Sequence, residues 1–191
     1  MDNLTGTHTL KNLMIGFTGE SMAINRYTYY AKVAQKEGYE QLSAIFLETA
    51  EHEKSHAKTF YRFIGGNPIE LNAKFPKTIL GTTKENLKAS ISGEYEEWTN
   101  LYPEFEKTAR EEGFKIIALK FNLIAKIEQF HEERFKKLLE NIDTQKVFIK
   151  EEKVKWICRK CGFIHEGESA LMKCPACDHP QAYFEILAEN Y

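Results

Sequence analysis

Two Glu-x-x-His segments set 75 residues apart constrain the fold of this chain more than any other feature of its sequence. The first contains Glu53 and His56, and the second contains Glu128 and His131. In a helix, residues three positions apart lie on one face, so each segment directs a carboxylate and an imidazole the same way. The residues around both segments are apolar at three- and four-residue spacing. Each segment is therefore expected to lie on the inner face of an amphipathic helix.

Apolar residues recur at this helical spacing in four segments. They run from Leu13 to Ala34, from Leu42 to Phe63, from Leu87 to Phe105 and from Phe114 to Leu138. Gly38 and Gly113 lie within the first and the last pair of segments, so each pair is expected to form an antiparallel hairpin. The stretch between the hairpins, residues 67–81, is long enough to cross from one end of the helices to the other. The pattern predicts a mainly α fold, a four-helix bundle with one long crossover.

The second hairpin repeats the first at an offset of 75 residues, with one interruption. Tyr27 aligns with Tyr102 at this offset, but Glu20 aligns with Glu94 at an offset of 74. The third helix therefore carries one additional residue between Glu94 and Tyr102. A helix absorbs one extra residue as a π-bulge, and Pro103, which has no N–H to donate, favours one here. The sequence thus predicts a single π-helical turn in this part of the third helix.

Four glutamates interrupt the apolar stripes at equivalent depths. A single glutamate of this kind is usually solvated at the edge of a stripe, but four at regular spacing are not explained that way. Buried carboxylates repel one another and are costly unless cations neutralise them. One Glu from each of two helices and a Glu-x-x-His from each of the other two form the ligand set of di-iron and di-manganese bundles. The expected ligands of two metal ions are Glu20, Glu53, His56, Glu94, Glu128 and His131.

Other titratable side chains lie near these positions. Glu97 is one turn beyond Glu94 and is either a fifth carboxylate ligand or a solvated side chain. The residues expected in solvent are Glu51, His52, Glu96, Glu132 and Glu133.

The four cysteines of the chain form two Cys-x-x-Cys pairs separated by twelve residues. They are Cys158, Cys161, Cys174 and Cys177. Four thiolates at this spacing suit a tetrahedral site for zinc or iron, and a dinuclear redox site nearby, which needs a source of electrons, favours iron. Helical periodicity ends before the cysteines, so two domains are expected, at residues 1–149 and 153–191. Short β-like pieces are expected at 155–157 and 183–187.

Charge and hydropathy exclude two classes of partner. The chain has 26 basic and 28 acidic residues, a net charge of −2, and so offers no polycationic surface for nucleic acid. No apolar run reaches the roughly 18 residues that a membrane span requires. The first residues lack the pattern of a secretory signal, so thiols are expected to stay reduced and the protein to be cytoplasmic.

These motifs together resemble the rubrerythrin family, and the resemblance covers essentially the whole chain. It rests on Glu20, Glu53-x-x-His56, Glu94-x-x-Glu97, Glu128-x-x-His131 and the two Cys-x-x-Cys pairs. It implies a ferritin-like bundle with two iron ions, followed by a rubredoxin-like domain with one iron on four cysteines, for which zinc is the alternative metal. It also implies that Glu97 is a ligand and that Tyr27 and Tyr102 lie beside the metal pair.

The activity that the resemblance implies is peroxidase activity in oxidative stress defence. Hydrogen peroxide would be reduced to water at the di-iron site, with His56 replacing Glu97 as a ligand on reduction. His56, Glu97, Tyr27 and Tyr102 are therefore the expected catalytic residues. Electrons would come from a rubredoxin or an NAD(P)H-dependent reductase through the iron held by the four cysteines. The expected assembly is a homo-oligomer, with a dimer as the simplest case.

Two other functions fit the same residues. The first is a ferroxidase or iron-handling role, in which iron enters and leaves the bundle. A seventh ligand and an attached source of electrons argue instead for metal that stays bound and cycles. The second is a non-enzymatic module stabilised by zinc, for which five glutamates and two histidines are more than a structural site needs.

Overall fold

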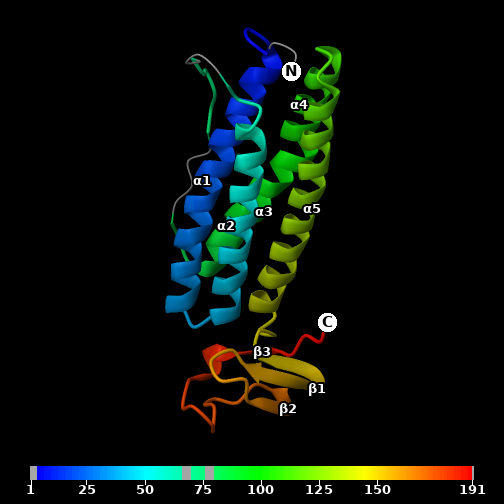
Figure 1. Cartoon of the computed structure of the whole chain (residues 1–191). Helices are drawn as coiled ribbons and strands as arrows, with labels where there is room; N and C mark the ends of the chain where they lie inside the picture. Colours follow the sequence, from blue (N-terminus) through cyan, green and yellow to red (C-terminus); the bar gives the residue numbers. More distant parts are fainter. Residues whose placement is uncertain (1–3, 66–69, 76–79, 191) are drawn as a thin grey trace.

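The computed structural model describes residues 4–65, 70–75 and 80–190 of the chain. Within these residues a long helical bundle is followed by a small β domain at one end of the bundle (Figure 1). The helices are α1 (His8–Lys36), α2 (Glu40–Tyr61), α3 (Thr83–Glu96), η1 (Glu97–Leu101), α4 (Tyr102–Glu111) and α5 (Lys115–Asp143). The predicted mainly α bundle is confirmed. Residues 67–69 and 76–79 of the predicted crossover lie outside the described residues.

The two hairpin turns have the same construction. Gly38 and Gly113 both adopt the left-handed conformation, with φ of 84° and 90°. Across each turn a backbone N–H returns to the preceding helix: that of Tyr39 donates to Ala34 over 2.9 Å, and that of Phe114 donates to Ala109 over 2.7 Å. A side chain at either glycine would strain this conformation, so glycine sets the point at which each helix pair turns back.

The third helix of the bundle is interrupted where the additional residue was predicted. Residues Glu97–Leu101 form the π-helical segment η1, and the N–H of Tyr102 donates to the carbonyl of Glu97, five residues earlier. Pro103 follows directly, at the start of α4. The predicted π-bulge is therefore confirmed, and its effect is to bring Glu94 and Tyr102 to the same inner face of the bundle.

Two apolar clusters fill the bundle, one on each side of the level at which the glutamates lie. One is built around the rings of Tyr27, Phe46 and Phe135, whose centroids are 5.4 to 6.0 Å apart. The other is built around Phe60, Tyr102 and Phe121, with centroids 5.1 to 6.0 Å apart. On α1, α2 and α5 the glutamates fall between residues of the first cluster and residues of the second. The carboxylate layer is therefore closed on both sides by packed aromatic rings.

The C-terminal domain is a three-stranded antiparallel sheet in the order β2-β1-β3. Its strands are β1 (Ile149–Cys158), β2 (Ile164–Ser169) and β3 (Phe184–Ile186). The β-like piece predicted at 155–157 falls in β1, and that predicted at 183–187 contains the shorter β3, whereas β2 was not predicted. The domain lies against the end of the bundle at which α1 turns into α2 (Figure 1), where the ring of Tyr39 stacks on Phe148 at 6.3 Å. None of the described helices is both long and apolar enough to cross a membrane.

Candidate metal centres

Six side chains from α1, α2, α3 and α5 meet at the middle of the bundle. Their donor atoms form two groups, each within 4.8 Å, and the groups share Glu53 and Glu128. One group adds Glu20 and His56, and the other adds Glu94 and His131. All four glutamates are at most 1% exposed, so the alternative that they are solvated at stripe edges is wrong.

The two histidines occupy equivalent places in these groups. Nδ1 of His131 lies 2.9 Å from Glu128, 3.1 Å from Glu53 and 3.7 Å from Glu94. Nδ1 of His56 lies 2.8 Å from Glu53, 3.0 Å from Glu128 and 3.8 Å from Glu20. The arrangement provides two similar donor sets joined by two shared carboxylates, which is the geometry of a dinuclear site.

Many of these donor atoms are poorly aligned for hydrogen bonding. Within the described residues, six buried atoms of the cluster make no hydrogen bond of good geometry, although Nδ1 of His131 and oxygens of Glu53 and Glu128 lie within 3.1 Å of an oppositely charged atom. They are Oε2 of Glu20, Oε1 of Glu53, Oε2 of Glu94, both carboxylate oxygens of Glu128 and Nδ1 of His131. Leaving a buried polar atom without a partner costs about 1 to 3 kcal/mol, and more if it is charged. A pair of cations would satisfy all six, so the residues present fit a dinuclear metal centre.

Without a cation, protons must neutralise the cluster. Burial raises the pKa of Glu20 well above its ordinary value, and it raises the pKa of Glu94 to about 8. Burial disfavours charge on the histidines as well, but the adjacent carboxylates outweigh it and raise the pKa of His56 to about 10 and of His131 to about 12. The same contacts outweigh burial at Glu53 and lower its pKa to about 2. Metal ions would take the place of these protons.

Two tyrosines bind Glu20 and Glu94, the two glutamates that each belong to a single donor group. The hydroxyl of Tyr27 on α1 donates to Glu94 on α3, and the hydroxyl of Tyr102 on α4 donates to Glu20 on α1. Burial, together with repulsion from these glutamates, raises the pKa of both phenols well above the ordinary value. Both hydroxyls therefore keep their protons and hold them within reach of the carboxylate layer.

Glu97 is close to the centre but belongs to neither donor group. It is the first residue of η1, and burial, with repulsion from Glu94, raises its pKa. It lines a cavity of about 500 Å³ together with Arg26, Lys74 and Phe75, among others. The structure thus places Glu97 between the carboxylate layer and a space that a small molecule could enter.

Two residues expected in solvent have other roles. Glu132 is only 3% exposed, and its carboxylate accepts a hydrogen bond from the indole of Trp98 over 3.0 Å and pairs with Lys136. His52 is half-buried, and its Nδ1 lies 3.0 Å from Nε2 of His131. The expectation for Glu132 was wrong because Trp98 covers it from a different helix, whereas the side chain of His52 stays 39% exposed and makes an additional contact with α5. A signal for His52 existed, since it is one turn before His56 on α2.

Glu51, Glu96 and Glu133 are exposed, as expected.

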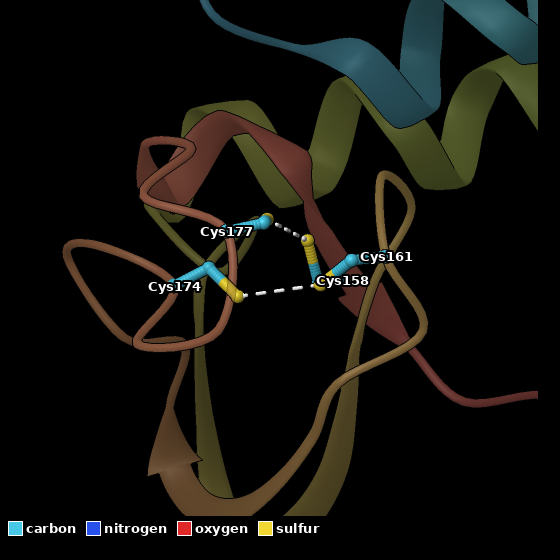
Figure 2. Close-up of side chains that lie close together, drawn as sticks. All are labelled: Cys158, Cys161, Cys174 and Cys177. Carbon is cyan, nitrogen blue, oxygen red and sulfur yellow. Dashed lines mark hydrogen bonds between the residues drawn. The ribbon is translucent and has the colours of Figure 1, made fainter.

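The four cysteines come together in the C-terminal domain, where two similar turns carry them (Figure 2). Sγ of Cys158 lies 3.8 Å from that of Cys177, and Sγ of Cys161 lies 3.6 Å from that of Cys174. A tetrahedral ion with bonds of about 2.3 Å requires sulfur separations of about 3.8 Å, so the set fits a single metal. Burial opposes the thiolate of Cys174, but N–H groups directed at it lower its pKa to about 7.

The turns of these two pairs close in the same way. The N–H of Gly162 donates to the carbonyl of Cys158 over 2.8 Å, and that of Asp178 donates to Cys174 over 2.9 Å. Both donors have positive φ, 79° for Gly162 and 62° for Asp178. The left-handed residue after each pair lets the backbone turn back and direct both thiols of the pair to one point.

Comparison with known proteins gives the same picture for both domains. The Rubrerythrin family matches residues 11–139, and the family described as Rubrerythrin, rubredoxin-like domain matches residues 156–185. The chain is 55% identical to Rubrerythrin-1 of Clostridium acetobutylicum over the full length of both proteins. It is 51% identical to Rubrerythrin of Porphyromonas gingivalis, covering 99% of this chain and 94% of that one. Among solved structures, a mixed-valence state of nigerythrin is similar with a TM-score of 0.64 at 30% identity, covering 97% and 89% of the two chains.

Proposed function

The chain belongs to the rubrerythrin family, and on that premise we propose that it is a peroxidase that reduces hydrogen peroxide to water in defence against oxidative stress. Both centres of the family are present, a di-iron carboxylate site and a rubredoxin-like site of four cysteines. The proposed ligands of the iron pair are Glu20, Glu53, His56, Glu94, Glu97, Glu128 and His131. Those of the third iron are Cys158, Cys161, Cys174 and Cys177.

The observation that carries this proposal is the matched pair of buried donor sets, each with a tyrosine hydroxyl against it. Reduction of one peroxide to two waters consumes two electrons and two protons. The iron pair, when bound, supplies the two electrons. Tyr27 and Tyr102 keep their protons in the buried layer, so each can hydrogen-bond or protonate a departing oxygen.

Glu97 and His56 are proposed to exchange as ligands between the oxidised and reduced states. Nδ1 of His56 lies in its donor group, whereas Glu97 lines the adjoining cavity, so His56 would be the ligand and Glu97 the displaced group if metal were bound in this arrangement. In this proposal a small substrate reaches the carboxylate layer through that cavity, because Glu97 lines it. A released Glu97 there is a further proton donor, because burial and its acidic neighbours favour its protonated form.

The four-cysteine centre is proposed as the entry point for electrons, from a rubredoxin or an NAD(P)H-dependent reductase. Its exposed ligand, Cys161, supports this role because it brings the centre to the surface of the domain. The proposed location is the cytoplasm, where the four thiols stay reduced.

A homo-oligomer, with a dimer as the simplest form, is proposed as the working assembly. Five large apolar side chains on one face of α5 are 38% to 68% exposed, and they support a contact with a second copy. They are Ile116, Leu119, Leu123, Ile127 and Phe130.

The test is to mix the fully reduced, iron-loaded chain with hydrogen peroxide or with oxygen in a stopped-flow instrument. A peroxidase is oxidised by peroxide at least about tenfold faster than by oxygen at equal concentration. Oxidation that is as fast with oxygen would favour the ferroxidase function instead. A chain that is colourless after iron loading, with zinc at the cysteines, would favour the zinc-stabilised module.

A further inference from the structure

His52 makes a contact that none of the proposed ligand roles explains. It lies on α2, one residue before Glu53, and its Nδ1 is 3.0 Å from Nε2 of His131 on α5. The two imidazole planes are 8° from parallel and their centroids are 5.2 Å apart, as expected for rings that meet edge to edge through these nitrogens. His131 is fully buried, and its other ring nitrogen, Nδ1, faces the carboxylates of the metal centre. The two nitrogens of His131 therefore have different partners. Nδ1 faces the carboxylates of the metal centre, and Nε2 faces His52.

The chemistry of the imidazole fixes which atom donates. A ring nitrogen that binds a metal must present a free lone pair, so the proton of a neutral His131 ligand resides on Nε2. That N–H then donates to Nδ1 of His52, which must be unprotonated to accept it. Histidine ligands of metals usually donate their second N–H to an outer partner, which fixes the orientation of the ring.

His52 is itself held by neighbours from both helices. Its Nε2 faces the carboxylate of Glu48 at 3.8 Å, one turn earlier on α2. Arg134 on α5 lies 3.0 Å from that carboxylate and donates to Thr49 over 2.6 Å. The guanidinium of Arg134 also lies over the ring of Phe130. These contacts join α2 to α5 on the outer side of His131 and restrict the positions that His52 can take.

The repeated hairpin offers an internal comparison. At the offset of 75 residues that relates the two halves, the position equivalent to His52 is Ile127. Isoleucine cannot accept a hydrogen bond, so this position offers His56 no acceptor like the one that His52 offers His131. The two histidines therefore make similar contacts with the shared carboxylates but differ in the residue at the position of His52.

We propose that His52 is a positioning residue for the metal centre, which accepts the Nε2 proton of His131 and so holds this imidazole with Nδ1 toward the metal pair. The proposal rests on the proposed role of His131 as a ligand. It also gives a reason for the two histidines to behave differently: His131 is held in place, whereas His56 is free to leave and return.

The test uses the full chain, freed of metal and titrated with Co(II) as the probe. His52→Leu removes the acceptor, and His52→Gln retains one in the amide oxygen. Loss of an outer partner of a ligand typically weakens metal binding by about 10- to 100-fold, and we expect this for His52→Leu at the bundle site only. His52→Gln should stay within about threefold of the unmodified chain. His165→Leu, the same change in the C-terminal domain, is the matched control and should leave the bundle site unchanged.

A second readout reports on the hydrogen bond itself. In the proton NMR spectrum of the Co(II)-loaded chain, the ring N–H of His131 should give a shifted signal that exchanges slowly with D2O. In His52→Leu this signal should exchange fast or vanish, and in His52→Gln it should persist. Circular dichroism of each variant checks that the helices are intact.

Two results would overturn the proposal. If His52→Leu binds Co(II) as tightly as the unmodified chain and retains the slow N–H, His131 does not depend on His52. If His52→Gln fails as badly as His52→Leu, the imidazole acts through packing and not as an acceptor. Failure of the unmodified chain to bind Co(II) in the bundle is a separate outcome, which would overturn the metal centre and this proposal with it.

Discussion

At the scale of single residues, the metal centre is defined by how its two histidines differ. His56 and His131 face the same two shared carboxylates at 2.8 to 3.1 Å. Of the two, His131 is the one whose Nε2 contacts a further imidazole, that of His52. Ile127, at the position equivalent to His52, cannot accept a hydrogen bond from His56, which fits a side chain proposed to exchange with Glu97.

We expect His56→Ala to retain both metal ions of the bundle but to lose most of its peroxidase turnover, about tenfold or more. Five glutamates and His131 remain to hold the metals, whereas the exchange with Glu97 is no longer available. The measurement is metal content per chain together with anaerobic turnover of peroxide. Turnover equal to that of the unmodified chain would contradict the exchange of Glu97 and His56.

The metal-free chain should become less stable as the pH rises from 6 to 9. Its folded state raises the pKa of Glu94 to about 8, above the ordinary 4.5, and those of His56 and His131 to about 10 and 12, above 6.5. A group with a raised pKa contributes stability that is complete below its unfolded pKa and is lost as the pH rises through its folded one. All three groups therefore act in the same direction across this window.

The measurement is the unfolding temperature of the metal-free chain at pH 6 and pH 9, which we expect to be lower at pH 9. Glu94→Gln should reduce the difference, because the amide does not titrate. The Zn(II)-loaded chain is the control, and there the dependence should weaken or reverse, since metal competes with protons for the same atoms. An unfolding temperature of the metal-free chain that rises with pH would contradict the raised pKa values of Glu94, His56 and His131.

Which residues could be predicted from the sequence depended on where their partners lie. Glu20, Glu53, Glu94 and Glu128 were predicted to converge because charged residues on apolar stripes are anomalous within their own helix. Glu132 was not, because its burial depends on Trp98, which reaches it from η1. Contacts made by a neighbouring helix leave no local pattern, and the position of Glu132 one turn after Glu128 does not by itself show that its carboxylate is covered.

At the scale of elements, α1 contains two glycines that differ in what surrounds them. A Cβ at Gly16 would lie 3.0 Å from the ring of Phe60, whereas a Cβ at Gly19 would meet nothing within 4 Å. Replacing glycine by alanine inside a helix normally stabilises it by about 0.5 to 1 kcal/mol. Forcing a methyl group into a packed core costs about 1 to 3 kcal/mol.

We therefore expect Gly19→Ala to raise the free energy of unfolding by about 0.5 to 1 kcal/mol and Gly16→Ala to lower it by about 1 kcal/mol or more. Each variant controls for the other, since both lie in the same helix three residues apart. Denaturant unfolding of the metal-free chains provides the measurement. Equal stability of the two variants would show that Phe60 moves aside without cost.

The elements themselves differed in how well their sequences predicted them. The π-helical η1 could be predicted because two repeated halves can be compared, and the comparison counts residues directly. Strand β2 was missed because its sequence, Ile164–Ser169, has five residues that are polar or glycine and a burial pattern without an apolar face. Its pairing with β1 comes from backbone hydrogen bonds and the nearby metal turns, which hydropathy does not record.

At the scale of the whole molecule, the two metal centres of one chain are far apart. The C-terminal domain contacts the bundle near the start of α2, at Glu40, and the carboxylate layer begins at Glu53. Thirteen residues of helix separate these positions, a rise of about 20 Å. Transfer of electrons over this distance within one chain would be slow, which favours delivery between two copies.

Two inactive variants should therefore restore each other. One lacks the four-cysteine site, as in Cys158→Ser with Cys174→Ser, and the other lacks Glu128 and His131 of the bundle. When the two are co-expressed, we expect peroxide turnover well above that of either alone. Leu123→Lys, which places a charge on the exposed apolar face of α5, should weaken association in gel filtration and reduce this complementation. Complementation that is absent, with turnover of the intact chain unaffected by dilution, would show transfer within one chain.

The two aromatic clusters above and below the carboxylate layer have a consequence for how the protein acquires its metals. Packed rings close this layer on both sides, and Glu97 lines the adjoining cavity, so we expect chelators to strip a bound ion slowly. An ion that the chain captures while it folds should therefore exchange slowly afterwards. The metal content of the purified protein should therefore reflect the metals in the growth medium. Adding iron to that medium should raise the iron content more than adding iron to the purified protein.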